Sequence, residues 1–427
     1  MAPPQSCAAG HSVPLAFYGY RCYNEAYSVA KEGFVMKRSC IRFCALLLCA
    51  GLLCASAAAE APSVFTQTML ERSFLQTGNT ERLHAAIQKA QNGETVTIAY
   101  LGGSITEGAL AKPQQTHCYA YLSAQAFAER YMADPSKLNY VNAGISGTPS
   151  LLGITRLEAD VLSHQPDIVF VEFAVNDSGD QISQGVYESL LRQLLIAECK
   201  PAVILVFTVL SGGNSCQEHM SKLGRHYNLG MISVKDAIWP EIEAGNMTWS
   251  DYSADYVHPN NEGHAFMADA IDYYYQQAEQ VPAEPFAMPR FIRISNPLEG
   301  LENIRHGDSR IQSVGGFPIG PVACYSYVMG WWHKGLISGT EPMVVVMEGS
   351  CMTVAYKQMK DTTWGSAQVW VDGVCKATLP GYDAGAWGNI QTQLITFSDK
   401  GPHTVEIRMA EGQEGKNFQL LDIAVVP

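Results

Sequence analysis

The chain has 427 residues, of which 47 % are hydrophobic, and its 28 Lys and Arg against 41 Asp and Glu give a formal net charge of −13. This length and composition allow two or three globular domains with sizeable cores and exclude a wholly disordered chain. The acidic balance disfavours nucleic acid and anionic membranes as partners, since no basic cluster in the folded part offsets it.

The first sixty residues have the features of an export signal. The basic residues Lys37 and Arg38 precede a short apolar run, Phe43–Leu53, and small residues follow at Ala55–Ala59. This order of basic, apolar and small residues is typical of a signal peptide. The alternative, a membrane anchor, is disfavoured because the run is shorter than the roughly 20 residues that a span requires.

Met36 stands directly before the basic residues. We therefore expect residues 1–35 to be an upstream extension and residues 36–59 to be a signal peptide that is cleaved after Ala59. The mature protein is expected to be secreted, periplasmic or at the cell surface, without stable insertion in the membrane.

Cysteine use leaves the redox state open. Six of the twelve cysteines fall before residue 60, and the other six are scattered without a Cys-x-x-Cys pair. That spacing disfavours a zinc site and allows many pairings, so free thiols and disulfides are both compatible with it.

Between residue 82 and about residue 280, short apolar runs alternate with amphipathic stretches. Strands that alternate with helices predict βαβ crossovers and a parallel sheet that is covered on both faces. The expected strands are Val96–Leu101, Tyr140–Asn142, Ile168–Val175, Val203–Val209 and Met231–Val234, and the expected helices include Tyr119–Tyr131, Leu151–His164, Tyr187–Glu198, Gln217–Tyr227 and Gly263–Ala278.

From about residue 281 the pattern changes to strand-like runs, after four prolines between residues 282 and 297. Asp372–Gly373 between two such runs is typical of a β-hairpin, and many short strands with glycine and proline turns indicate an all-β sandwich. We expect an α/β domain over residues 60–284 and a β-sandwich over residues 285–427. The expected strands are Val344–Met347, Thr353–Tyr356, Gln368–Val371, Val374–Thr378, Thr404–Met409 and Gln419–Val426.

Ligands of an open α/β sheet bind beyond the carboxyl ends of its strands, so the residues after each strand matter most. The first strand leads into Gly102–Gly108, in which Ser104 stands where the strand gives way to a helix. The glycines allow a sharp turn and the close approach of a ligand. Ser104 and Glu107 also fit an ordinary capping box, whereas a nucleotide loop is disfavoured because no Lys-Ser or Lys-Thr follows the glycines.

Polar turns follow the next two strands as well. Asn142–Gly147 is a flexible turn after the second strand, and Asn176 and Asp177 follow the third. Glu172, inside the third strand, shares a face with apolar residues. We interpret it as a structural hydrogen-bond acceptor, because a buried carboxylate needs partners.

Before the last helix, Asp255 precedes His258 by three residues, and Pro259 follows directly. The Asp255 carboxylate can orient the imidazole through Nδ1–H, which leaves Nε2 free to take a proton from a serine hydroxyl. A metal site on His258 and His264 is disfavoured, since the spacing is not the i, i+4 pair of a helical zinc site and no third ligand cluster is visible. We expect no metal.

Four short blocks, Gly103-Ser104, Gly144, Asn176-Asp177 and Asp255-x-x-His258, resemble in this order the SGNH/GDSL hydrolase superfamily. The resemblance covers roughly residues 95–275, and each block falls at an expected strand end or just before the last helix. It implies a three-layer, flavodoxin-like α/β fold with a parallel five-stranded sheet.

Carried over by position, the resemblance implies a role for five residues. Ser104 is the expected nucleophile, His258 the general base and Asp255 the partner that orients it. The expected oxyanion hole consists of the Ser104 and Gly144 amides and the Asn176 side chain. No cofactor is implied.

Five of the seven tryptophans lie beyond residue 330. Exposed aromatic rings on a β-sandwich can stack on the apolar faces of sugars, so Trp331 and Trp332 are candidate substrate-binding residues. The alternative is that these rings fill the core, since tryptophan is highly buried on average. The domain resembles the jelly-roll-like carbohydrate-binding β-sandwiches attached to bacterial carbohydrate esterases.

These expectations combine into a secreted serine esterase that removes acetyl or other short acyl groups from a polysaccharide or oligosaccharide. The alternatives left open are a lipase or thioesterase on longer acyl chains, an acyltransferase with the same triad, and a non-catalytic glycan-binding surface protein.

Overall fold

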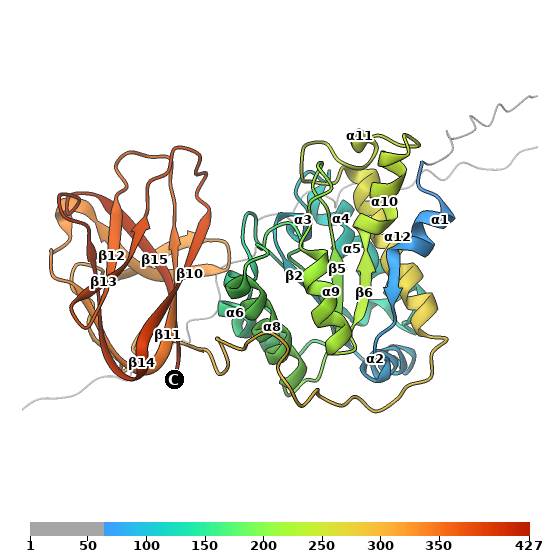
Figure 1. Ribbon diagram of the computed structural model, residues 1–427, viewed down its shortest axis with the longest axis horizontal. Coiled ribbons are helices and arrows are strands. Elements are labelled where there is room, and N and C mark those ends of the chain that lie inside the picture. Colours follow the sequence, from blue (N-terminus) through green and yellow to red (C-terminus); the bar gives the residue numbers. More distant parts are fainter. Residues whose placement is uncertain (1–63) are drawn as a thin grey trace, which may run out of the picture. The chain divides into compact units, whose positions relative to one another are not determined.

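The computed structural model describes residues 64–427, which form an α/β part followed by a β part (Figure 1). The expected upstream extension, residues 1–35, and signal peptide, residues 36–59, lie outside the described residues. None of the helices in the described part combines the length and the apolar character that crossing a membrane requires.

The α/β part is built on a six-stranded sheet with the order β1-β6-β5-β4-β2-β3. The five strands β2 to β6 are parallel and confirm the expected sheet, in the flavodoxin-like order 2-1-3-4-5 when β1 is left out. The short antiparallel edge strand β1 was not expected. The bounds are β1 (Phe74–Gln76), β2 (Val96–Gly102), β3 (Leu138–Gly144), β4 (Ile168–Glu172), β5 (Ala202–Phe207) and β6 (Gly230–Ser233).

Helices cover both faces of this sheet, because its central strands are apolar on both sides. Ile98 and Tyr100 face one core, with α1, α2, α5, α10 and α12, while Ala99 and Leu101 face the other, with α6 to α9. The three layers are therefore confirmed. The helices are α1 (Gln67–Ser73), α2 (Glu81–Gln91), α3 (Ser104–Glu107), α4 (Gln114–His117), α5 (Tyr119–Tyr131), α6 (Ser150–Thr155), α7 (Leu157–Asp160), α8 (Gln181–Ile196), α9 (Gln217–His226), α10 (Val234–Glu243), α11 (Trp249–Tyr252) and α12 (Asn261–Ala278).

One helix differs from its expectation. The stretch Leu151–His164 is not continuous, since α6 ends at Thr155, α7 follows it, and a 3₁₀ turn covers Leu162–His164. The break falls at Arg156, whose side chain is fully buried and donates to the Gly102 carbonyl at 3.2 Å. A buried guanidinium that must find acceptors thus accompanies the break in the helical pattern.

The β part is an antiparallel sheet of nine strands, seven of which follow the order β13-β12-β14-β11-β15-β10-β9, while β7 pairs with β15 and β8 with β11. The expected hairpin is confirmed: Val371 pairs with Val374, and Asp372 and Gly373 have φ of 49° and 80°, as a two-residue turn with a left-handed backbone requires. The strands are β7 (Glu302–Asn303), β8 (Ile311–Ser313), β9 (Ile319–Cys324), β10 (Tyr327–Lys334), β11 (Met343–Lys357), β12 (Ser366–Val371), β13 (Val374–Pro380), β14 (Ile390–Met409) and β15 (Asn417–Val426).

The strand β11 joins two segments that the sequence pattern separates. A bulge between Gly349 and Cys351 shifts its register against β14, so the residues that face the core of the β part change from odd to even numbers. Beyond the bulge, Cys351 and Ala355 point the other way and pack with residues of the α/β part. β11 therefore contributes both to the core of the β part and to the contact with α6.

The segment between α12 and β7 is fastened to the α/β part by Glu188, a fully buried carboxylate of α8. Its oxygens accept from the amides of Arg293 and Ile294 at 2.6 Å and from the Tyr227 hydroxyl at 2.5 Å. Residues Glu60–Pro427 form one compact unit, so a boundary at residues 284–285 stays a prediction.

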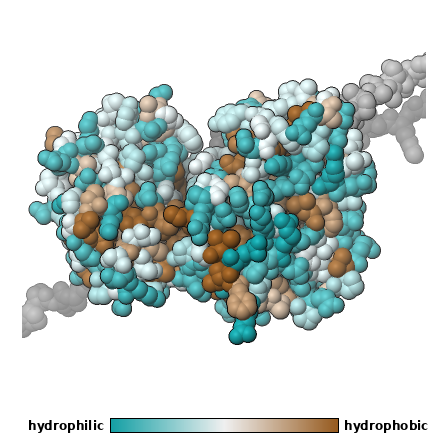
Figure 2. Space-filling model, in the orientation of Figure 1, coloured by the Kyte–Doolittle hydropathy of each residue, from teal (hydrophilic) through white to brown (hydrophobic). Residues whose placement is uncertain are grey.

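The surface is mixed in character. On the face seen in Figure 2, apolar patches alternate with polar surface on both parts, as is normal for a folded protein. The most exposed large apolar side chains are Leu336 and Ile337, in a turn after β10, at 92 % and 89 %.

Candidate active site

Ser104 lies in a tight turn at the carboxyl edge of the sheet. Gly103 is the N-cap of α3 and Ser104 its first residue, so the capping box that Ser104 and Glu107 would form is not made. A Cβ on Gly103 would lie 2.2 Å from Asn176 Oδ1, and one on Gly102 would lie 2.1 Å from Thr106 Oγ1. The turn can pack this closely only because both positions are glycine.

His258 and Asp255 complete a hydrogen-bonded chain with this serine. His258 Nε2 lies 2.8 Å from Ser104 Oγ, and His258 Nδ1 lies 2.7 Å from Asp255 Oδ2. Asp255 Oδ1 accepts from the amides of Val257 and His258 at 2.7 and 2.6 Å. Burial acts to raise the pKa of Asp255, but the hydrogen bonds from His258 and the two amides outweigh it and lower the pKa, so the carboxylate stays charged.

The loop that carries His258 is held from both sides. The Ser253 hydroxyl lies 2.6 Å from the His258 carbonyl, and the Trp249 indole N–H donates to the Asp255 carbonyl at 2.5 Å. Ser253 also pairs with Pro259 in an isolated bridge. The backbone therefore fixes the direction of the imidazole before any substrate arrives.

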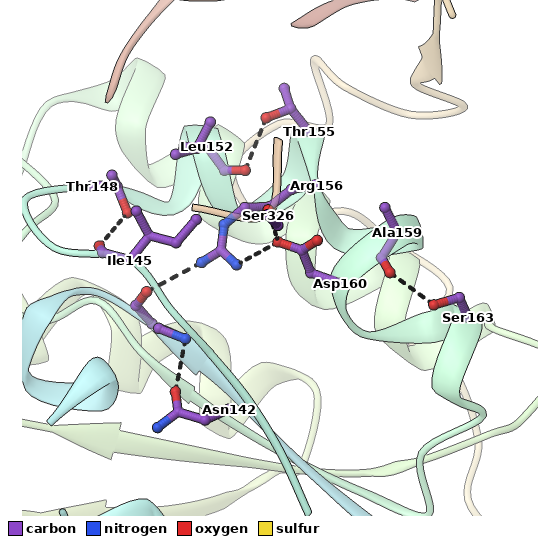
Figure 3. A network of polar contacts seen from close by, with 12 residues as sticks. Asn142, Ile145, Thr148, Leu152, Thr155, Arg156, Ala159, Asp160, Ser163 and Ser326 are labelled. Atoms are coloured by element: carbon purple, nitrogen blue, oxygen red, sulfur yellow. Dashed lines mark hydrogen bonds and ion pairs between the residues drawn. The ribbon is translucent and has the colours of Figure 1, made fainter. Parts of the chain in front are cut away.

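The three groups expected to form the oxyanion hole differ in the hydrogen bonds that they already make. Ser104 begins a helix, so its amide has no intrahelical acceptor. Asn176 lies against Gly103, and its buried Oδ1 has no hydrogen-bond partner among residues 64–427. The Gly144 amide already donates to Asn142 Oδ1 at 2.9 Å (Figure 3), so it can serve an oxyanion only by sharing its proton.

Two carboxyl groups, those of Glu172 and Asp177, accept hydrogen bonds from residues in and next to these turns. Glu172, fully buried, accepts from the Thr208 and Thr106 hydroxyls at 2.6 and 3.2 Å, which fits its interpretation as a structural acceptor. Asp177 accepts from the Ser150 amide at 2.7 Å, at the start of α6. Burial raises the pKa of both carboxyl groups to about 7.

His264 forms its hydrogen bonds with the backbone and not with His258. It is fully buried in α12, its Nδ1 accepts from the Tyr119 amide at 3.3 Å, and its Nε2 lies 3.3 Å from the Ala109 carbonyl. Burial lowers its pKa to about 4, so the ring is neutral. Residues 64–427 contain no group of three His, Cys, Asp or Glu side chains placed to hold a metal ion.

The two selected tryptophans lie in the β part. Both lie on the regular strand β10, where alternation turns Trp331 into the core of the β part and Trp332 outward, with Lys334 Nζ 4.6 Å from its ring centre. Trp331 is 4 % exposed.

Three other side chains surround the loop after β3 and were not selected from the sequence. Glu107 Oε2 accepts from the Ser146 amide at 2.8 Å, and Tyr325 of the β part lies next to Ser146. Trp387, 64 % exposed, lies against Gly147, where a Cβ would be 3.1 Å from its ring. Only the C-terminal enrichment in tryptophan pointed toward Trp387, and it did not single out this ring.

Comparison with known proteins agrees with the fold. Residues 100–266 match the model of the GDSL-like Lipase/Acylhydrolase family. The thioesterase 1/protease 1/lysophospholipase L1 of Escherichia coli (strain K12) is 30 % identical over 142 residues, which cover 31 % of this chain and 65 % of that protein. The match thus spans slightly less than two thirds of that relative.

Two solved structures are similar over both parts of the chain. Both are of a two-domain esterase (CEX) active on acetylated mannans, and one was co-crystallised with mannopentaose. They are 28 % and 29 % identical to this chain, cover 84 % of it and 98 % and 99 % of their own chains, and have a TM-score of 0.73.

Residues 100–266 are thus similar to the GDSL-like Lipase/Acylhydrolase family, and the two parts of the chain together are similar to a two-domain esterase. These matches confirm the resemblance to the SGNH/GDSL hydrolase superfamily that is seen in the sequence.

Proposed function

We propose that this protein is a secreted serine esterase that removes acetyl groups from a polysaccharide through an acyl-enzyme on Ser104. The observation that carries the proposal is the unbroken chain of hydrogen bonds from Ser104 through His258 to Asp255. A serine hydroxyl is a poor nucleophile until a base accepts its proton, and this chain supplies the base and its orientation.

The reaction follows from these contacts. Ser104 Oγ attacks the ester carbonyl carbon and passes its proton to His258 Nε2. The tetrahedral intermediate collapses, the bond to the sugar oxygen breaks, and His258 returns the proton to that oxygen. A water molecule then attacks the acetyl-serine, again losing a proton to His258, which releases acetate and restores the Ser104 hydroxyl.

The negative charge on the carbonyl oxygen needs donors that are fixed in advance. We assign this role to the Ser104 amide, which has no intrahelical acceptor, and to the Nδ2 group of the Asn176 side chain. The Gly144 amide contributes by sharing its proton with Asn142. Asn142 would then tune the strength of this third donor.

A carbohydrate substrate is supported by the solved structures and by Trp387. The two-domain esterase that resembles this chain over both parts acts on acetylated mannans. Trp387 exposes most of its ring beside Gly147, three residues after Gly144, where a sugar could stack on it. We therefore place acetylated mannan first among the substrates.

We also retain the expected organisation as part of this proposal. Residues 60–284 form the catalytic domain and residues 285–427 the β domain, while residues 36–59 direct export and residues 1–35 are an upstream extension. An N-terminal sequence that starts at Glu60 in protein recovered from the medium or periplasm would support the last two assignments.

Acetate release tests the activity. The wild type should release acetate from acetylated mannan faster than from acetylated xylan, and Ser104→Ala should lose this activity while keeping its thermal unfolding midpoint. Ser146→Ala, which alters a neighbouring hydroxyl outside the triad, serves as the matched control and should retain turnover. Full activity in Ser104→Ala would reject the mechanism.

The second candidate, an esterase or thioesterase for longer acyl chains, is favoured by the similarity to the Escherichia coli thioesterase and lysophospholipase. Aryl esters of increasing chain length separate the two. An acetylesterase should lose kcat/KM steeply beyond two carbons, whereas a rise toward eight or more carbons would favour the second candidate. Absence of turnover on every ester, with mannan binding retained, would favour the non-catalytic alternative.

A further inference from the structure

The carbonyl group of Gly102, two residues before Ser104, accepts two hydrogen bonds. The Ile145 amide donates to it at 3.1 Å, and Arg156 Nη2 donates to it at 3.2 Å. Ser104 begins a helix of only four residues, and so short a helix has little stability of its own. The direction in which the chain enters Ser104 therefore depends on how firmly the Gly102 carbonyl is held.

Arg156 is a costly residue to bury. Its side chain is 1 % exposed, its Nη1 donates to Asp160 Oδ2 at 3.1 Å, and its Nε has no hydrogen-bond partner among residues 64–427. Replacing a buried ion pair by well-packed apolar residues is often neutral or stabilising. Stability is therefore a weak reason for an arginine at this position, whereas the hydrogen bond to the Gly102 carbonyl is a specific one.

The β part reaches this arginine through Asp160. Ser326, at the tip of the β9–β10 hairpin, donates its hydroxyl to the same Oδ2 atom at 2.9 Å, and Figure 3 shows Arg156, Asp160 and Ser326 next to one another. Because both hydrogen bonds meet at one oxygen atom, Ser326 helps to fix the acceptor that orients the guanidinium. A hydroxyl of the β part is thus linked by three successive hydrogen bonds to the residue before Gly103.

The second donor to the Gly102 carbonyl also comes from a segment that contacts the β part. The buried side chain of Ile145 belongs to one apolar cluster with Val322 and Cys324 of β9 and with Ala355 of β11. Both groups that hold the carbonyl are therefore supported by residues of the β part, one through packing and the other through hydrogen bonds.

We propose that Arg156 is a positioning residue for Ser104, and that Ser326 of the β part sets its orientation through Asp160. This inference rests on the proposed function, because it adds a residue to the reaction at Ser104. Arg156 makes no contact with substrate in this role and acts only through the Gly102 carbonyl. A displacement of about 1 Å in a reacting group can cost roughly 100-fold in rate, so a well-held carbonyl at this position matters for acyl transfer.

The test measures kcat on an aryl acetate per competent site, with the sites counted by covalent titration of the serine with a fluorophosphonate. In Arg156→Gln we expect kcat per site to fall by roughly 10- to 100-fold, with KM little changed. Arg156→Lys keeps the charge and one donor, so it should recover part of the loss. A residue that only stabilised the fold would lower the number of titrated sites and the thermal unfolding midpoint, but not kcat per site.

Ser326→Ala tests the contribution of the β part and, because Ser326 is exposed, also serves if Arg156→Gln fails to fold. It should lower kcat per site by roughly threefold, the effect of one lost hydrogen bond. The double variant should be no slower than Arg156→Gln alone, since the hydroxyl acts only through the arginine. Ser163→Ala is the matched control: it removes a hydroxyl that donates to the Ala159 carbonyl at 2.8 Å in the same segment, and kcat should not change.

Two results on an active wild type would overturn the proposal and leave the proposed function intact. One is a kcat per site in Arg156→Gln within a factor of about two of the wild type. The other is a double variant whose loss is the product of the two single losses, because Ser326 would then act independently of Arg156. A wild type that is neither labelled nor active would instead disprove the proposed function, and this inference with it.

Discussion

Gly103 has no room for a side chain, because the position of a Cβ is only 2.2 Å from Asn176 Oδ1. Gly103→Ala should therefore displace the Asn176 side chain while leaving the sheet intact. We expect kcat to fall by roughly 10²–10³-fold, the effect of losing one oxyanion donor, with KM little changed.

Steady-state kinetics on an aryl acetate measure this effect. Gly339→Ala is the matched control, since a Cβ there meets nothing within 4 Å. A kcat in Gly103→Ala within a factor of about two of the wild type would show that Asn176 is not a donor to the oxyanion.

Asp255 keeps its negative charge in the folded protein because hydrogen bonds from His258 and two amides lower its pKa. Asp255→Asn should reduce kcat by about 10⁴-fold at neutral pH, since an amide holds the imidazole in the wrong tautomer. Because the pKa of Asp255 is lowered, its carboxylate stays ionised as the pH falls through the ordinary range of aspartate. Protonation of Asp255 should therefore not cause a loss of wild-type activity as the pH falls through that range.

A pH–rate profile of wild type and variant checks both points. Asp251→Asn, in the neighbouring helix, is the control and should retain turnover. An Asp255→Asn variant with more than about a tenth of the wild-type kcat would contradict the role given to this carboxylate.

The residues at strand ends could be predicted from the sequence, and the aromatic residues of the β part could not. Ser104 and Asn176 follow parallel strands, whose carboxyl ends share one edge, so topology alone places them together. Trp387 lies in a loop between β13 and β14, whose course no periodicity defines. Trp331 was chosen for its paired ring, and alternation along β10 buried it.

At the scale of helices and strands, the buried carboxylate of Glu188 holds the segment that joins the two parts. Glu188→Ala removes the acceptors of the Arg293 and Ile294 amides and of the Tyr227 hydroxyl. We expect faster amide hydrogen exchange and tryptic cleavage at Arg290 and Arg293, since backbone amides without acceptors favour local opening.

Hydrogen exchange with mass spectrometry resolves this effect. Glu81→Ala, which frees only the Phe286 amide in the same segment, is the control and should leave residues 291–296 protected. Equal protection of residues 291–296 in wild type and Glu188→Ala would contradict the fastening role.

Helices and strands differed in how far their limits could be predicted. Tyr119–Tyr131 has the bounds that the pattern indicates, because its apolar face is regular. Leu151–His164 breaks at Arg156, whose buried guanidinium binds a carbonyl on β2, a tertiary contact that no local pattern contains. β11 spans two expected strands, and a bulge between Gly349 and Cys351 changes its core-facing residues from odd to even numbers, which no local pattern predicts.

For the molecule as a whole, buried acids link stability to pH. Burial raises the pKa of Asp422 from 3.8 to about 7, so between these values the folded state holds a proton that the unfolded state has released. The stabilisation present at low pH is therefore lost as the pH rises from about 4 toward 7. Relative to Asp422→Asn, wild type should lose up to about 1.4 kcal/mol per pH unit in this range.

Thermal unfolding midpoints of both proteins between pH 4.5 and 8 test this linkage. The two curves should converge or cross below pH 7 and run parallel above it. Glu348→Gln, an exposed carboxyl, is the control and should parallel the wild type throughout. Parallel curves for Asp422→Asn over the whole range would contradict the prediction.

The tip of the β9–β10 hairpin reaches two places in the α/β part at once. Tyr325, with a left-handed φ of 51°, lies next to Ser146, and Ser326 donates to Asp160, the partner of Arg156. The β part is consequently not an interchangeable cassette. If the β part were exchanged with that of a relative at the connecting segment, the strained hairpin tip would lose the residues that it contacts. The exchange should therefore succeed only if the loop after β3 and the α6–α7 segment are exchanged together with the β part.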